Sequence, residues 1–169
     1  MKTLNILSLF DWMSAGQIAL NKLWITNYRY FASEIDKYAI QVTQKNYPNT
    51  IQIWDITKIC SNKWTILSDY IPQTNSKIDL LIWWSPCQWF SFAWKQLNFS
   101  DPRSALFFEY VRILKEVKPK FFILENVASA PLEAKIIMAK CFATLLTPKD
   151  DEWDDWELVN ENTWLLFFN

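Results

Sequence analysis

Four acidic or nucleophilic side chains stand where apolar segments of the chain end. They are Glu34, Asp55, Cys87 and Glu125, and each follows a segment that is predicted to be a buried strand. Open α/β sheets bind their ligands at the carboxyl ends of parallel strands, so these side chains are expected to face one site. Their coincidence at that edge predicts an active site in which Cys87 is the reactive group.

Five apolar segments are expected to form the strands that position these groups. They cover residues 4–10, 28–33, 51–53, 78–82 and 121–124. Helical patterns lie between them, at residues 17–23, 36–47 and 101–117. Strands that alternate with helices indicate an α/β fold with a Rossmann-like, doubly wound parallel sheet. Residues 58–76 have no clear pattern and are expected to hold a short helix and a polar loop.

The first strand, a tight turn and a helix form the unit that opens many nucleotide-binding sheets. The turn at residues 11–16 has to let a ligand approach its backbone, which requires small side chains. Trp12 contradicts that requirement, whereas glycine would meet it. Trp24 then follows the helix at a position where glycine is the usual left-handed terminator. Glu34 stands about 20 residues beyond the turn, where an acidic residue typically binds ribose hydroxyls.

Glycine and tryptophan are present in unusual amounts. The chain has 1 glycine and 11 tryptophans in 169 residues, and together they reach about 7%, the share of glycine alone in average proteins. We hypothesise that most tryptophans stand for glycines, because a UGA codon that one cell reads as glycine becomes tryptophan under another genetic code. The alternative is a genuinely tryptophan-rich chain, such as a carbohydrate- or membrane-binding module.

Composition excludes several classes of protein. The chain has no histidine, which removes Ser-His and Cys-His catalysis and nearly every zinc hydrolase. Its 3 cysteines have no paired spacing, so neither a disulfide framework nor a metal site is expected. No apolar run approaches the roughly 18 residues of a membrane span, and the N-terminus lacks the pattern of a signal peptide. We expect a cytoplasmic protein of one domain, or part of one, without membrane contact.

Six segments of the chain resemble, in order, the motifs of the DNA cytosine-5 methyltransferase family of bacterial and phage type. They are Leu9–Gly16, Ala32–Ala39, Trp54–Ile56, Trp83–Ser91, Asp101–Phe108 and Glu125–Val127. The fourth segment is similar to the family's catalytic motif Gly-Gly-Ser-Pro-Cys-Gln-Gly-Phe-Ser, with tryptophan in place of each glycine. The tryptophans that replace family glycines are Trp12, Trp24, Trp54, Trp83, Trp84, Trp89 and Trp94. The hypothesis that they stand for glycines therefore rests on motif positions as well as on composition.

The resemblance implies methyl transfer from S-adenosyl-L-methionine to C5 of a cytosine in double-stranded DNA. Cys87 would add as a thiolate to C6 of a flipped-out cytosine, and Glu125 would act as the acid at N3. Glu34 would bind the cofactor's ribose, Asp55 its adenine amine, and Leu106 would pack the adenine. The complete set of residues implied to contact the cofactor is Phe10, Asp11, Trp12, Met13, Ala15, Glu34, Ile35, Asp55, Ile56, Pro86 and Leu106.

The resemblance covers roughly residues 4–130. Residues 1–130 are expected to form part of the S-adenosylmethionine-binding catalytic domain, and residues 131–169 a divergent tail with a helix at 132–146 and a strand at 163–168. The family's target-recognition region finds no match, so we expect the C-terminal half of the enzyme to be missing or to be a separate chain. The chain as written is expected to be inactive, because indoles would occupy cofactor space and crowd the catalytic loop.

Two alternatives stay open at this point. A transferase that methylates cytosine in tRNA shares the same catalytic motifs, and only the recognition region would separate it from a DNA enzyme. The other alternative is a catalytically inactive fragment or a subunit of a split methyltransferase.

Overall fold

A computed structural model describes residues 2–62, 65–68, 77–84 and 102–125 of the 169-residue chain. The predictions for Pro86 and Cys87 fall outside these residues, as do those for the helix at 132–146 and the strand at 163–168. Glu125 is described as part of a strand.

A parallel sheet of five strands in the order β3-β2-β1-β6-β7 forms the centre of the molecule. The strands are β1 (Leu4–Leu9), β2 (Tyr28–Ser33), β3 (Ile51–Gln52), β6 (Leu80–Trp84) and β7 (Phe121–Glu125). The chain moves outward from β1 to β3 and then returns to the opposite side of β1, so the order reverses between β1 and β6. The predicted doubly wound α/β fold is confirmed.

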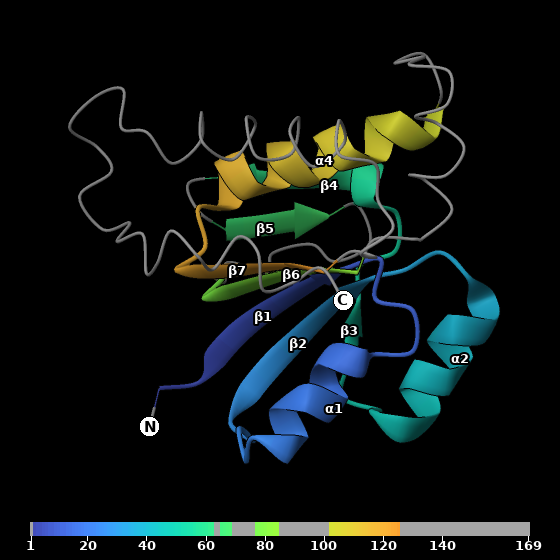
Figure 1. Ribbon diagram of the computed structural model, residues 1–169, viewed down its shortest axis with the longest axis vertical. Coiled ribbons are helices and arrows are strands. Elements are labelled where there is room, and N and C mark those ends of the chain that lie inside the picture. The colour runs from blue at the N-terminus through green and yellow to red at the C-terminus, as the bar shows by residue number, and fades with distance from the viewer. Residues whose placement is uncertain (1, 63–64, 69–76, 85–101, 126–169) are drawn as a thin grey trace.

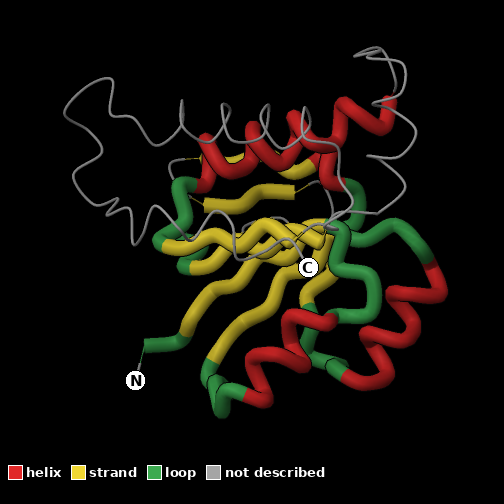
Figure 2. Tube along the Cα trace, in the orientation of Figure 1, coloured by secondary structure: helices red, strands yellow, loops and turns green. Residues whose placement is uncertain are grey.

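Helices cover both faces of this sheet, as Figure 1 shows. The helices α1 (Ala15–Lys22) and α2 (Lys37–Asn46) lie on one face and α4 (Pro102–Val117) lies on the other. Figure 2 shows the same arrangement by type of element, with yellow strands between the red helices. No helix within the described ranges has the length and apolar character needed to cross a membrane.

Two apolar clusters fill the space between the sheet and its helices. On the α4 side, Leu9 and Trp83 pack with Tyr110 of the helix. On the α1 side, Ile82 packs with Leu20 of that helix. Neighbouring residues of one strand divide between the clusters because successive side chains of a strand point to opposite faces. The sheet is therefore buried on both sides, as parallel sheets usually are.

Residues 58–76 differ from the prediction of a short helix and a polar loop. A 3-10 turn, η1 (Ile56–Lys58), leads into a hairpin of two antiparallel strands, β4 (Ile59–Asn62) and β5 (Thr65–Ser68). The hairpin lies on the same side of the sheet as α4 (Figure 1). Its strands are only 4 residues long, which is too short for an alternating pattern to stand out in the sequence.

The strand predicted at residues 78–82 lies two residues further along the chain. Strand β6 runs from Leu80 to Trp84, so the two tryptophans belong to the strand and do not follow it. Pairing with β7 explains the shift, because Trp83 stands opposite Leu124 and Trp84 opposite Glu125. The predicted end at Ile82 is wrong because this pairing partner lies about 40 residues away and leaves no local signal.

Candidate active site

The carboxyl ends of β1, β2 and β3 bring several of the predicted site residues to one edge of the sheet. The backbone N–H of Asp11 donates to the carbonyl of Ser33 over 3.1 Å. The Ser33 hydroxyl in turn donates to the carbonyl of Trp54 over 2.7 Å. The segments that leave the three strands are therefore held together by hydrogen bonds, and Glu34 and Asp55 directly follow Ser33 and Trp54 in the chain.

Glu34 closes the first turn through its carboxylate. Its Oε2 accepts a hydrogen bond from the backbone N–H of Trp12 over 2.9 Å. Its Oε1 accepts from the N–H groups of Ile35 (2.8 Å) and Asp36 (2.9 Å). A carboxylate offers about four lone-pair positions, so a partly exposed Glu34 keeps capacity for a ligand hydroxyl. Glu34 thus shapes the turn and still presents an acceptor beside it.

Asp11 supports the turn from inside the protein. It is 1% exposed, and its carboxylate accepts hydrogen bonds from the hydroxyls of Tyr30 (2.8 Å) and Ser14. Burial raises the pKa of Asp11, although the hydrogen bonds from Ser14, Ser8 and Tyr30 act in the opposite direction. The Asp11 carboxylate faces the interior, so the predicted contact of this residue with a cofactor is restricted to its backbone.

A buried polar network beneath the turn was not predicted from the sequence. Gln17 of α1 donates to the hydroxyls of Ser14 (3.2 Å) and Thr50 (2.8 Å), and Thr43 of α2 donates to the carbonyl of Trp12 over 3.3 Å. Gln17 and Thr43 are 3% and 1% exposed. The only signal in the sequence is a polar residue on the buried face of each helix. These contacts anchor the turn to both helices on one side of the sheet.

The only glycine allows α1 to approach the sheet closely. A Cβ atom at Gly16 would stand 2.5 Å from the Tyr30 hydroxyl and 3.2 Å from Cδ1 of Ile82. The first distance is shorter than any ordinary contact, so a larger residue would push the helix away from β2.

Three tryptophans at family glycine positions adopt the left-handed backbone conformation. Their φ angles are 51° at Trp12, 59° at Trp24 and 55° at Trp54. A residue with a side chain pays roughly 1–2 kcal/mol in this conformation, whereas glycine adopts it freely. Phe10 and Ser14 also have positive φ, so the first turn alternates between left-handed and other residues.

Trp24 occupies the terminating position of a Schellman motif. The N–H of Ile25 donates to the carbonyl of Leu20 over 3.0 Å, and the N–H of Trp24 donates to that of Asn21 over 3.1 Å. These are the two bonds of the motif, whose left-handed residue is usually glycine. The predicted left-handed terminator after the first helix is therefore confirmed in its backbone geometry.

Asp55 caps the short turn that follows β3. Its Oδ1 accepts hydrogen bonds from the N–H (2.9 Å) and the hydroxyl (2.8 Å) of Thr57. Its Oδ2 has no hydrogen-bond partner among the described residues, so it is able to accept one from a ligand. Ile56 is buried in the cluster beneath, and the half-buried Leu106 of α4 packs against the same cluster.

The remaining predicted residues lie around this edge with different degrees of exposure. Phe10 is half-buried, whereas Trp12, Met13, Ala15 and Ile35 are exposed. Glu125 ends β7 and pairs in register with Trp84 of β6, so its backbone lies at the same edge of the sheet. The described structure therefore brings residues 10–15, 34–35 and 55–56 to one edge of the sheet, whereas Pro86 and Cys87 lie outside the described residues.

Comparison with known proteins agrees with this arrangement. The sequence matches the family of C-5 cytosine-specific DNA methylases over residues 4–136. It is 47% identical over 97 residues to the type II methyltransferase M.NlaIV of Neisseria lactamica, a match that covers 57% of this chain and 20% of that protein. It is 38% identical over 129 residues to the orphan methyltransferase M.SPRI of Bacillus phage SPR, covering 75% of this chain and 27% of the phage protein.

A solved structure supports the fold. The chain is similar to a mutant of Spodoptera frugiperda DNMT2, with a TM-score of 0.55 and 22% identity over 85% of this chain and 40% of that one. The chain spans about a fifth to a quarter of the length of the curated relatives named above. The family match covers well over half of the chain, and the protein therefore belongs to the family of C-5 cytosine-specific DNA methylases.

Proposed function

We propose that the protein methylates C5 of cytosine in double-stranded DNA with S-adenosyl-L-methionine as methyl donor. The observation that carries this proposal is the placement of Glu34 and Asp55 at neighbouring strand ends, beside a turn that Glu34 itself closes. Such an edge next to the switch point is where doubly wound sheets bind nucleoside cofactors. Family membership supplies the type of reaction.

The described residues suit the adenosine part of the cofactor. Glu34 has acceptor capacity for the ribose hydroxyls, and Asp55 Oδ2 can accept a hydrogen bond from the adenine amine. Ile35, 74% exposed, and Leu106 offer apolar surface for the adenine ring. One feature disagrees, since the indole of Trp12 is 59% exposed on the turn that would have to admit the ligand. A glycine at this position would remove the obstacle.

Catalysis would fall to residues on the two neighbouring strand ends. We infer that the Cys87 thiolate adds to C6 of a cytosine turned out of the duplex, which makes C5 nucleophilic. Glu125 would hold the N3 proton and so favour that addition. S-adenosylmethionine supplies the electrophilic methyl group when it is bound. A base then removes the C5 proton, the C5–C6 double bond returns and Cys87 is expelled as a thiolate.

The remaining expectations belong to this proposal as well. They are a catalytic domain within residues 1–130, a tail at 131–169, DNA as the partner and a cytoplasmic location. Pro86, Met13 and Ala15 are retained as proposed cofactor contacts.

Methyl transfer tests the proposal directly. Full-length protein with glycine at the seven replaced positions is incubated with methyl-labelled S-adenosylmethionine and double-stranded DNA. Label is expected at C5 of cytosine, and Cys87→Ser is expected to abolish its incorporation. Label that enters tRNA and not DNA would contradict the proposed substrate. A Cys87→Ser variant with full activity would contradict the mechanism.

A further inference from the structure

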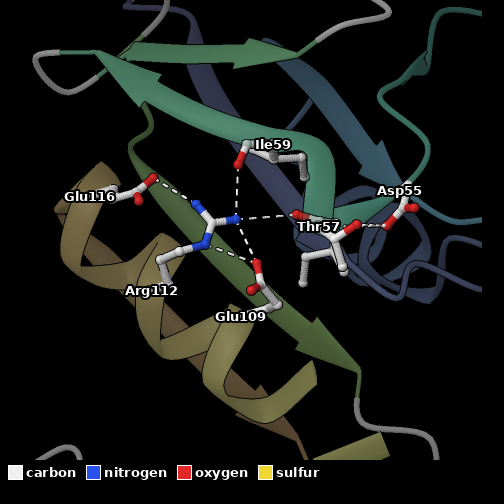
Figure 3. Close-up of polar contacts among 7 residues, drawn as sticks. Asp55, Thr57, Ile59, Glu109, Arg112 and Glu116 are labelled. Carbon is white, nitrogen blue, oxygen red and sulfur yellow. Dashed lines mark hydrogen bonds and ion pairs between the residues drawn. The ribbon is translucent and has the colours of Figure 1, made fainter. Parts of the chain in front are cut away.

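A single arginine joins the Asp55 segment to helix α4. The guanidinium of Arg112 donates to the carbonyl of Ile59 over 2.9 Å and to that of Ile56 over 3.3 Å. Figure 3 shows these bonds running from the Arg112 side chain on the helix to the backbone of the η1 segment and of Ile59. Arg112 therefore holds the carbonyl of the first residue of η1, the turn that Asp55 caps, and the carbonyl of the residue that follows the turn.

Two glutamates of the same helix orient this arginine. Glu109 accepts from Nε (2.9 Å) and from the nitrogen that binds the carbonyls (2.6 Å), while Glu116 accepts from the other terminal nitrogen over 2.8 Å. Burial alone would lower the pKa of Arg112, but the hydrogen bonds and charges of Glu109 and Glu116 outweigh it and raise the pKa. The guanidinium therefore stays charged and fixed in direction, and all three of its nitrogens are used.

The arginine links two segments, around Asp55 and around Leu106, that would lie on different sides of the cofactor's adenine ring in the proposed site. Asp55 and Ile56 stand at the end of β3, whereas Leu106 stands on α4, six residues before Arg112. Six residues of helix span about 9 Å, so one helix carries both the apolar contact of Leu106 and the hydrogen bonds of Arg112. Ile56 and Leu106 share one apolar cluster, which shows that the two segments meet.

We propose that Arg112 is a positioning residue for the cofactor, which sets the place of Asp55 and Ile56 relative to Leu106 by holding the backbone carbonyls of Ile56 and Ile59 against α4. The inference rests on the proposed function, because it assigns Arg112 to the adenine side of that site. It does not make Arg112 a ligand of the cofactor. The arginine acts on Asp55 through the backbone of η1.

Cofactor affinity is the measurement that separates this role from a general contribution to stability. Full-length, glycine-restored protein is titrated with S-adenosylmethionine, and the dissociation constant is compared between the parent and Arg112→Met, which keeps much of the side chain's bulk. We expect the variant to bind about tenfold more weakly, a loss of about 1.4 kcal/mol. Lys115→Met, on the exposed face of the same helix, is the matched control and should bind within twofold of the parent.

A double-mutant comparison tests the route through Asp55. In an Asp55→Asn background, Arg112→Met is expected to weaken binding less than twofold further, because both changes damage one interaction. The KM for S-adenosylmethionine should rise in Arg112→Met while the KM for DNA stays within twofold. If Arg112 only stabilised the fold, the variant would have a smaller fraction of active protein, and the KM for S-adenosylmethionine would not rise relative to the KM for DNA.

The outcomes distinguish the two proposals. A parent protein that binds no S-adenosylmethionine would overturn the proposed function. Equal affinity of the parent and a folded Arg112→Met variant for S-adenosylmethionine would overturn the role of Arg112 and would leave the proposed function standing. If Arg112→Met does not fold, Arg112→Lys is measured instead, because lysine keeps the charge but has a single nitrogen, which cannot bind Glu109, Glu116 and both carbonyls together. The lysine variant is expected to bind at least threefold more weakly, and unchanged binding would overturn the inference.

Discussion

The tryptophans of the turns and those of strand β6 occupy opposite kinds of environment. Trp12, Trp24 and Trp54 have left-handed backbones and are exposed to solvent. Their exposed fractions are 59%, 87% and 41%, respectively. Trp83 and Trp84 lie in regular parallel pairing, and Trp83 is fully buried. Its indole stacks on Tyr110 with ring centroids 4.7 Å apart. The turns therefore favour glycine through their backbone alone, whereas in β6 only the family motif predicts it.

This difference sharpens the hypothesis that the tryptophans stand for glycines. At the three turn positions the conformation gives support that does not depend on the resemblance. At Trp83 the fold accommodates the indole. Trp84 likewise lies in the regular pairing of β6 with β7, opposite Glu125. The gene sequence is the simplest check, since UGG codons at these positions would refute a UGA origin.

The largest effect is expected at the buried indole. In the chain as written, Trp83→Gly should lower the free energy of unfolding by about 3–5 kcal/mol, because it leaves a cavity against Tyr110 and Phe10. Denaturant unfolding followed by far-UV circular dichroism measures this loss. Trp83→Phe, which keeps an aromatic ring, is the control and should lose markedly less. A loss below about 1 kcal/mol would show that the cluster does not depend on the indole.

A smaller effect of opposite sign is expected at the end of α1. Trp24→Gly should raise the free energy of unfolding by about 0.5–1 kcal/mol, since relief of left-handed strain exceeds the entropy cost of glycine. Trp24→Ala removes the same indole but keeps a Cβ, and it should gain almost nothing. Equal stability of the two variants would mean that the indole, and not the backbone, sets the energy at this position.

The smallest effect concerns the carboxyl beneath the first turn. The folded protein raises the pKa of Asp11. The stability that this residue contributes is therefore fully present at a pH below the pKa of the unfolded carboxyl. It is lost as the pH rises through the higher pKa of the folded protein. Asp11→Asn keeps a hydrogen-bond acceptor but does not titrate. The stability of the parent relative to the variant should therefore fall as pH rises above about 4, where the unfolded carboxyl titrates. A difference that is constant with pH would contradict the raised pKa.

Much of the framework could be predicted because its signals are local. Asp36 caps α2 by accepting from the N–H groups of Tyr38 and Ala39, as its position before a helical pattern predicts. The strand–turn–helix at the start of the chain likewise brings Glu34 to the turn. Spacing along the chain was sufficient in both cases, since each contact joins segments whose order a doubly wound sheet fixes.

The rest depends on contacts between distant segments. The end of β6 follows from its pairing with β7, and the β4–β5 hairpin from packing of short strands beside α4. Arg112 lies more than 50 residues from the carbonyls that it binds, so its helical position indicates only an exposed charge. The pattern at residues 17–23 indicates only an ordinary helix around Gln17, although the amide of this residue joins Ser14 to Thr50. No periodicity in one segment reveals such pairings.

The central claim is that the edge between Trp12 and Trp54 is a cofactor site that these two indoles obstruct. The most direct measurement is the dissociation constant of S-adenosylmethionine for full-length protein as written and for the Trp12→Gly/Trp54→Gly variant. We expect the variant to bind at least about tenfold more tightly, a gain of about 1.4 kcal/mol. Trp24→Gly, at the opposite end of α1, should leave the constant unchanged. Equal affinity of the two proteins, or a double variant that binds no cofactor, would contradict the claim.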